Sequence, residues 1–280
     1  MAIERVEIGA TGMLRTRYWT DMTWTDFKTS DMSEVIAVLP IAAVEQHGPH
    51  LPLGVDLFLM QGYMERAIAR LPADLDVLFL PAQPIGNSIE HTDFPGTLSL
   101  SATTVIAMLG EIGASIHRAG CRKLVLLNSH GGNVPLLDTV AHELRARFGL
   151  FVVMATWHRF GYPDGLFSAE ELLHGIHAGD VETSLMLSFR PELVRHDRLA
   201  DFPSQSLVLE NDYTWLRAGR PTGFGWMTQD LSTSGAMGNA EAASAAKGEA
   251  SADYGATAFV ELLQDIADFD LEWLDSEPQA

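Results

Sequence analysis

The 280-residue chain is poor in cysteine and in basic residues. Its single cysteine, Cys121, excludes an intrachain disulfide, which is typical of proteins from a reducing compartment. Lysine and arginine number 18 against 37 acidic residues, and the formal net charge is −19. Nucleic acids and anionic membrane surfaces bind basic patches, so we expect neither a nucleic acid nor a membrane as partner.

The sequence also lacks the patterns that direct proteins to membranes. No stretch approaches the roughly 18 apolar residues of a membrane-spanning helix. The N-terminus "MAIERVEIGATGML" has neither the basic start nor the apolar core of a signal peptide. We therefore expect a cytoplasmic protein. No internal repeat and no linker-like tract divides the chain, which predicts one domain over residues 1–280.

Four short apolar segments, each bounded by turn residues, alternate with segments of helical length. The apolar segments predict buried strands at residues 34–42, 76–82, 123–129 and 150–157. The longer segments predict helices at residues 55–71, 101–120 and 133–148, the second of them capped by Ser101. Strands that alternate with helices are typical of βαβ units. The predicted fold class is therefore α/β, with a mostly parallel central sheet covered by helices on both faces.

The last third of the chain has a different character. Residues 201–237 are loop-like, with several glycines and two exposed-looking tryptophans, and we expect a lid or a subunit contact there. Residues 239–269 are rich in alanine and predict a helix that covers one face of the sheet.

Polar side chains with catalytic potential gather in four motifs. The motifs are "VEQHGPHLPLGVD" (44–56) with Glu45, His47 and Asp56, "GNSIEHTDFPGT" (86–97) with Ser88, "NSHGGN" (128–133) with His130, and "HGIHAGDVETS" (174–184) with His177 and Glu182. Two of them follow predicted strands directly, and parallel sheets bind ligands at the carboxyl ends of their strands. Histidine, aspartate and glutamate are also the ligands of hydrolytic divalent metals.

The spacing within the first motif favours a metal site. Glu45 and His47 lie on the same side of an extended segment, because side chains alternate along a strand. Two ligands on one side suit adjacent metals, and Asp56 at the start of the next helix can point back at the strand end. Taken singly, each motif also has a structural explanation, such as a glycine-rich turn at 131–133 or a helix start stabilised by Asp180. Their coincidence at strand ends favours the functional interpretation.

Four ordered stretches resemble the creatininase (creatinine amidohydrolase) family. They are "LPIAAVEQHGPHLPLGVD", "FPGTLSL", "NSHGGN" and "HAGDVETSLML", with weaker similarity in "GAMGNAEAASAAKGE" at residues 235–249. The resemblance implies a three-layer α/β/α sandwich, a dinuclear metal centre and hydrolysis of a non-peptide C–N bond, commonly in a cyclic amide. It further implies a homo-oligomer, since members of this family tend to form hexamers.

The resemblance also implies roles for individual residues. Glu45 and His47 would be terminal ligands on separate metals, Asp56 would bridge the metals, and His130 would complete the first site. His177 would be the acid/base that protonates the leaving nitrogen. Two further residues, Ser88 and Trp157, lie where creatininase contacts its substrate. The cofactor would be two divalent ions per subunit, and mixed nitrogen and oxygen ligands suit zinc, manganese or iron.

The chain departs from creatininase just after His130. A glutamate ligand of creatininase is replaced by Gly132, and a tyrosine that touches substrate is replaced by Gly131. The missing ligand is therefore expected from elsewhere, and Glu182 is the candidate, either as a ligand or as a residue that orients one. The glycines also predict additional space for substrate, with Gly131 facing it.

These patterns predict a dinuclear metal-dependent amidohydrolase that acts on a small cyclic amide or lactam related to creatinine. Serine catalysis is disfavoured because no G-x-S-x-G motif is present, and Cys121 enters a predicted strand. The alternatives are a formamide hydrolase acting on a pyrimidine intermediate, a peptide-trimming enzyme, and a member that binds metal or a small molecule without catalysis.

Overall fold

The computed structural model describes residues 14–275, so the N-terminal stretch considered as a targeting signal lies outside the described residues. Its main sheet has four strands in the order β2-β1-β3-β4, and all three strand pairs are parallel. The strands are β1 (Ile36–Ile41), β2 (Val77–Phe79), β3 (Lys123–Asn128) and β4 (Phe151–Thr156). Each lies inside a segment predicted from the sequence, and the parallel pairing is confirmed.

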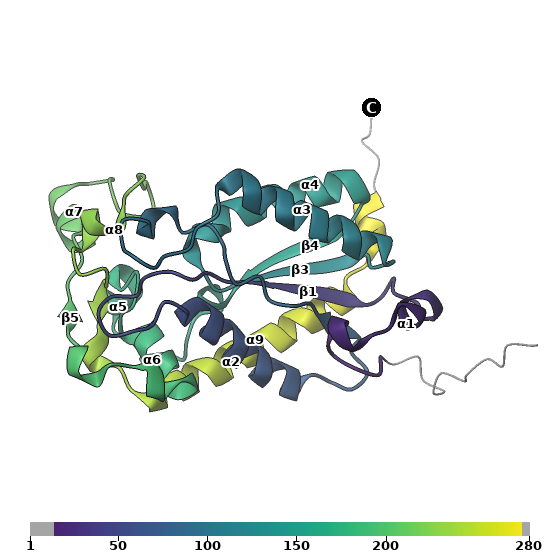
Figure 1. Ribbon diagram of the computed structural model, residues 1–280, viewed down its shortest axis with the longest axis horizontal. Coiled ribbons are helices and arrows are strands. Elements are labelled where there is room, and N and C mark those ends of the chain that lie inside the picture. Colours follow the sequence, from purple (N-terminus) through teal and green to yellow (C-terminus); the bar gives the residue numbers. More distant parts are fainter. Residues whose placement is uncertain (1–13, 276–280) are drawn as a thin grey trace, which may run out of the picture.

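Helices cover both faces of this sheet (Figure 1). Helices α2 (Val55–Arg70), α6 (Asp180–Phe189) and α9 (Ala245–Asp268) pack on one face, and α3 (Ala102–Arg118) and α4 (Val134–Phe148) on the other. Successive residues of β1 point to opposite faces, so that Val38 enters one core and Leu39 the other. The α/β/α sandwich expected from the sequence is therefore confirmed.

The strands differ in burial according to their place in the sheet. β1 and β3 are fully buried because they have a neighbour on each side and a helical layer on each face. β4 is an edge strand, and only its last two residues are buried, while Met154 is 41% exposed. The prediction of a buried strand at 150–157 is therefore wrong for its first part, since an apolar run does not reveal an edge position.

The remaining elements are short. They are α1 (Trp24–Thr29), α5 (Ala169–His174), α7 (Ser206–Asp212), α8 (Thr228–Leu231) and the antiparallel pair β5 (Asp201–Phe202) and β6 (Gly238–Asn239). Apart from α1, they lie together beyond the carboxyl ends of the strands, at the left of Figure 1. The segment 201–237 thus contains more regular structure than its sequence suggests, and its role as a subunit contact stays a prediction.

Two expectations from the composition concern Cys121 and membranes. Cys121 is buried, and burial raises the pKa of its thiol to about 12, which leaves it protonated and unreactive at neutral pH. Among the described residues, none of the helices combines the length and apolar character needed to cross a bilayer.

Candidate metal centre

A cavity of about 350 Å³ lies at the carboxyl edge of the sheet. Its walls come from the loops that follow β1 and β3, from the first turns of α2 and α6, and from segments distant in sequence. The lining residues are Glu45, Asp56, Glu90, His91, Ser129, His130, Gly131, Gly132, His158, Ile176, His177, Glu182 and Trp226. The lining includes residues of all four sequence motifs, with Glu90 and His91 from the second. We call this space the metal cavity.

Asp56 lies between two histidines of the metal cavity. It stands in the first turn of α2, and its Oδ2 atom is 3.9 Å from His47 Nε2 and 4.0 Å from His130 Nδ1. Oδ2 is buried, and none of the described residues forms a hydrogen bond with it. A buried carboxylate oxygen without a partner is costly unless a cation neutralises it. Asp56 Oδ2 is therefore a candidate ligand atom for a cation.

In each of the two histidines, a hydrogen bond to a backbone carbonyl shows which ring nitrogen carries a proton. His47 Nδ1 donates to the carbonyl of Glu45 at 3.0 Å, and His130 Nε2 donates to the carbonyl of Asn87 at 2.9 Å. The opposite nitrogen of His47, Nε2, therefore carries a lone pair that points toward the carboxylates. Burial acts to lower the pKa of His130, but the charge of Glu45 outweighs it and raises this pKa to about 10, so His130 Nδ1 holds a proton facing Glu45 that a bound cation would replace. A backbone carbonyl that fixes the tautomer of a histidine is the usual support of a metal ligand.

Two further carboxylates complete the donor set. Glu45 Oε1 is 3.2 Å from His130 Nδ1, and Glu45 Oε2 is buried without a hydrogen bond from the part of the chain that the structure describes. Glu182 Oε2 is 3.8 Å from His47 Nε2 and accepts the Ala178 N–H at 2.6 Å. The candidate ligand atoms form three overlapping groups, each within 4.8 Å: Glu45, Asp56 and His130; His47, His177 and Glu182; and Glu45, His91 and His177.

The electrostatics of the metal cavity call for cations. Burial, followed by the charge of Glu45, raises the pKa of the Asp56 carboxyl well above its ordinary value. Burial also acts to raise the pKa of Glu45, but the nearby His130 outweighs it and holds that pKa below its ordinary value. Burial lowers the pKa of His47, which keeps the imidazole neutral and able to donate a lone pair. Divalent ions would relieve the repulsion among these carboxylates, and the residues present fit them.

His177 occupies the opposite wall of the cavity. Its Nε2–H donates to the carbonyl of Gln46 at 2.6 Å, and its Nδ1 lies 3.8 Å from Glu45 Oε1. Its backbone forms a reciprocal hydrogen-bonded bridge with Met237, at 3.2 and 2.7 Å. That bridge joins the segment 235–249 to the loop that carries His177.

His91 lies beside Glu45, where the sequence left it as either a partner of a metal ligand or a substrate contact. The Gln46 side-chain amide is oriented because its Oε1 accepts from Gly48 N–H and its Nε2 donates to the Gly235 carbonyl. Gln46 Nε2 also donates to His91 Nδ1 at 2.8 Å, which leaves the ring proton on Nε2, 3.4 Å from Glu45 Oε1. The glutamine between the two predicted ligands therefore fixes the tautomer of this histidine.

The three residues predicted to contact substrate lie in different places relative to the metal cavity. Gly131 lines the metal cavity with open space around it, whereas Ser88 is buried behind the cavity, with Oγ 3.4 Å from His130 Nε2. Trp157 lies in the core, where it stacks on Tyr63 at 4.4 Å. We therefore withdraw the assignment of Trp157 to the substrate, because the ring at the end of β4 packs against α2 instead.

Trp226 is the tryptophan that does line the metal cavity. It comes from the segment 201–237, and its Nε1 donates to the Ala218 carbonyl at 2.7 Å. In the sequence, Trp226 is an aromatic residue within the glycine-rich segment 201–237. That pattern was compatible with a lid and with a subunit contact. Only the folding of this segment over the strand ends reveals which face the ring meets.

Gly132 does not provide the additional space that the sequence suggested. A Cβ atom at this position would lie 2.5 Å from both Glu90 Oε1 and His130 Nε2, so the expectation of an opening is wrong here. The carboxylate of Glu90 fills the volume beside Gly132, and burial raises its pKa. A carboxylate is therefore present beside Gly132 after all, but Glu90 supplies it from another loop, with its Oε1 3.7 Å from His130 Nε2.

Comparison with known proteins places this geometry in a family. The family model for creatininase, creatinine amidohydrolase, matches residues 20–263. Creatinine amidohydrolase of Pseudomonas putida is 32% identical over 212 residues, which cover 68% of this chain and 78% of that protein. The chain belongs to the creatininase family.

Two further similar proteins extend the comparison. A mycofactocin precursor peptide peptidase of Mycobacterium tuberculosis is 37% identical over 169 residues, 58% of this chain and 61% of that protein. The structure of a creatininase variant of the Zn–Zn type superposes with a TM-score of 0.69 at 26% identity, covering 90% of this chain and 98% of the other. This chain is thus similar to proteins named for creatinine and for a precursor peptide, and it is a hydrolase of the creatininase family.

Proposed function

We propose that the protein is a dinuclear metal-dependent hydrolase of an amide C–N bond. The observation that carries this proposal is the unpaired, buried Oδ2 of Asp56, nearly equidistant from His47 and His130. One ion would be held by Glu45 and His130, the other by His47 and Glu182, with Asp56 between them. Two-metal hydrolases place their ions roughly 3.5–4 Å apart, a spacing that suits one shared carboxylate.

The chain supplies proton transfer and orientation. Two bound divalent ions would polarise an amide carbonyl and acidify water. His177 presents Nδ1 to the cavity while its Nε2–H stays on the Gln46 carbonyl, so the ring can take up a proton at Nδ1 and deliver it to the leaving nitrogen. His91 and Gln46 hold Glu45 in place.

Two substrate classes are compatible with this site. A small cyclic amide or lactam, as in creatinine, would fit the metal cavity of about 350 Å³ by itself. A peptide amide is favoured by the adjoining cavity described below and by the similarity to a mycofactocin precursor peptide peptidase. A formamide on a pyrimidine intermediate and a purely binding role remain as outcomes of a substrate screen.

Metal stoichiometry tests the proposal. We expect elemental mass spectrometry to find two equivalents of zinc, manganese or iron per chain in protein purified without chelators. Glu182→Gln should retain about one equivalent, because it removes a charged donor beside His47. Glu170→Gln is the matched control, an exposed glutamate on α5 that should retain two.

The result has two ways to contradict the proposal. One equivalent or none in the unmodified protein, unchanged after metal is added, would leave a mononuclear or binding role. Two equivalents in Glu182→Gln would show that Glu182 orients a ligand through its bond to Ala178 instead of binding an ion itself.

A further inference from the structure

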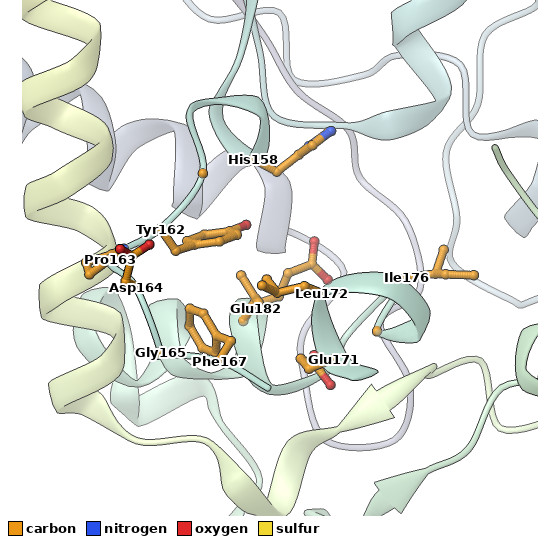
Figure 2. Close-up of a pocket in the computed structure, with 13 residues that line it drawn as sticks. His158, Tyr162, Pro163, Asp164, Gly165, Phe167, Glu171, Leu172, Ile176 and Glu182 are labelled. Carbon is orange, nitrogen blue, oxygen red and sulfur yellow. The ribbon is translucent and has the colours of Figure 1, made fainter. Parts of the chain in front are cut away.

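A second cavity, of about 550 Å³, adjoins the metal cavity (Figure 2). His158, Ile176 and Glu182 line both cavities. The Glu182 carboxylate that faces His47 at 3.8 Å is therefore also a wall of the second cavity. The two cavities therefore meet at Glu182, and a substrate long enough to pass this side chain would occupy both.

The second cavity has several large apolar side chains in its lining. The rings of Tyr162 and Phe167 meet edge to face at 5.1 Å and form one side of it. Leu172 and Ile176 also line it, and they are 55% and 37% exposed. Exposed apolar side chains that gather around one cavity are typical of a ligand-binding site. We call this space the apolar cavity.

The charges around the apolar cavity select against an anionic ligand. None of its lining residues, all within the described range, is a lysine or arginine, and three are acidic. Of these, Glu171 is already satisfied, because its carboxylate accepts the N–H groups of Asp180 at 2.7 Å and Asn239 at 2.9 Å. A negatively charged group would meet the carboxylate of Asp164, and no lysine or arginine lines the cavity to compensate the repulsion. A neutral apolar group meets no such cost.

We propose that the apolar cavity is a substrate subsite that receives an aromatic or branched aliphatic side chain beside the amide to be hydrolysed. Its volume lies within the range of ligand sites, roughly 300–1,000 Å³. The assignment of a cleaved bond next to this subsite rests on the proposed function, whereas binding of the apolar group does not. The substrate class is then a neutral acyl or peptidyl amide with a bulky apolar residue.

Binding of two blocked amino acids tests the subsite apart from catalysis. The probes are N-acetyl-L-phenylalaninamide and N-acetylglycinamide, titrated by NMR into metal-loaded and into chelator-treated protein. We expect the phenylalanine probe to bind at least tenfold more tightly, because burying a large apolar side chain in a preformed cavity is favourable. Blocked peptides with phenylalanine or glycine at one position should show the same preference in kcat/KM.

Two neighbouring leucines of α5 provide a matched pair of variants. Leu172 lines the apolar cavity, while Leu173, 61% exposed, lines a different cavity with Arg217 and Arg220. Leu172→Glu should reduce the preference for the phenylalanine probe to about twofold or less, and Leu173→Glu should leave it unchanged. Both side chains are exposed, so both variants should fold, and thermal unfolding checks this. Leu172→Gln serves as a milder second variant.

Each outcome decides the proposal. A preference that Leu172→Glu removes and Leu173→Glu retains supports the subsite, even if metal analysis finds one ion or none and the proposed function fails. Equal binding of the two probes to the unmodified protein overturns the subsite and leaves the proposed function intact. A preference that both variants retain, or that both lose while folded, places the apolar site elsewhere and overturns this assignment.

Discussion

The metal cavity and the apolar cavity share a wall but are built in different ways. The metal cavity collects Glu45, Asp56, His130 and Glu182 from three motifs that are distant in sequence, and Glu45 Oε2 and Asp56 Oδ2 find no hydrogen-bond partner among the described residues. The apolar cavity is lined entirely by residues of the continuous segment 158–182. The carboxylate of Glu171 in its wall already accepts a hydrogen bond from the Asp180 N–H. The difference indicates that the chemistry depends on the whole sheet, whereas the choice of substrate depends on one segment that can vary by itself.

The strongest test of this separation is Asp56→Asn. The change removes the charge shared by both ion positions, so we expect loss of bound metal and a fall in amide hydrolysis of roughly 10³-fold or more, since metal catalysis is worth several kcal/mol. Binding of N-acetyl-L-phenylalaninamide should persist. Elemental analysis, turnover and the NMR titration measure the three quantities. Asp164→Asn, an exposed change at the apolar cavity, is the control that should keep metal and turnover.

A smaller effect, confined to turnover, is expected for His177→Gln. Loss of a general acid typically costs roughly 10²–10⁴ in rate, while the ions should remain because none of the five proposed ligands is removed. Single-turnover rates and metal content check this result. The exposed His142→Gln on α4 should change neither quantity. Metal loss equal to the loss of rate would identify His177 as a ligand.

The smallest effect concerns His50, which supports the metal cavity from behind without lining either cavity. Burial lowers its pKa to about 4, and its Nε2 lies 3.0 Å from Thr183 Oγ1. Between pH 6.5 and 4 the unfolded chain therefore binds more protons at this histidine than the folded chain does, so stability falls as the pH falls through that window. The contribution is of the order of 2–3 kcal/mol, fully present above pH 6.5.

Urea unfolding of metal-free protein at several pH values measures this dependence. His50→Asn should flatten the fall in the free energy of unfolding between pH 6.5 and 4, apart from any uniform loss at all pH values. His196→Asn, at an exposed position, should leave the slope as it is. An unaltered slope in His50→Asn would assign the acid sensitivity to the histidines inside the metal cavity.

Much of the fold and of the donor set was predictable because local sequence carries the signal. The central strands β1 and β3 are continuous apolar runs since both faces are buried, and Ser101 caps α3 by accepting from Thr104 N–H, as predicted. The candidate ligands Glu45, His47 and His130 follow strand ends within a few residues, and parallel strands bring their carboxyl ends to one edge.

The positions of the supporting residues depended on contacts between distant segments. Three contacts join residues that no local pattern relates. They are the hydrogen bond from Gln46 to Gly235, the backbone bridge between His177 and Met237, and the contact of Glu90 with Gly132. For the same reason the sequence pointed to Trp157, which lies in the core, whereas Trp226 lines the metal cavity.

The amino-acid sequence by itself determined the strands, the helices and the chemical nature of the donors, because periodicity and residue type are local properties. Tertiary structure alone decided which nitrogen of each histidine faces the metal cavity, which carboxylate fills the corner beside Gly132, and that an apolar cavity adjoins Glu182. These are outcomes of packing, since a tautomer, a filled corner or a cavity exists only once the surrounding segments have met.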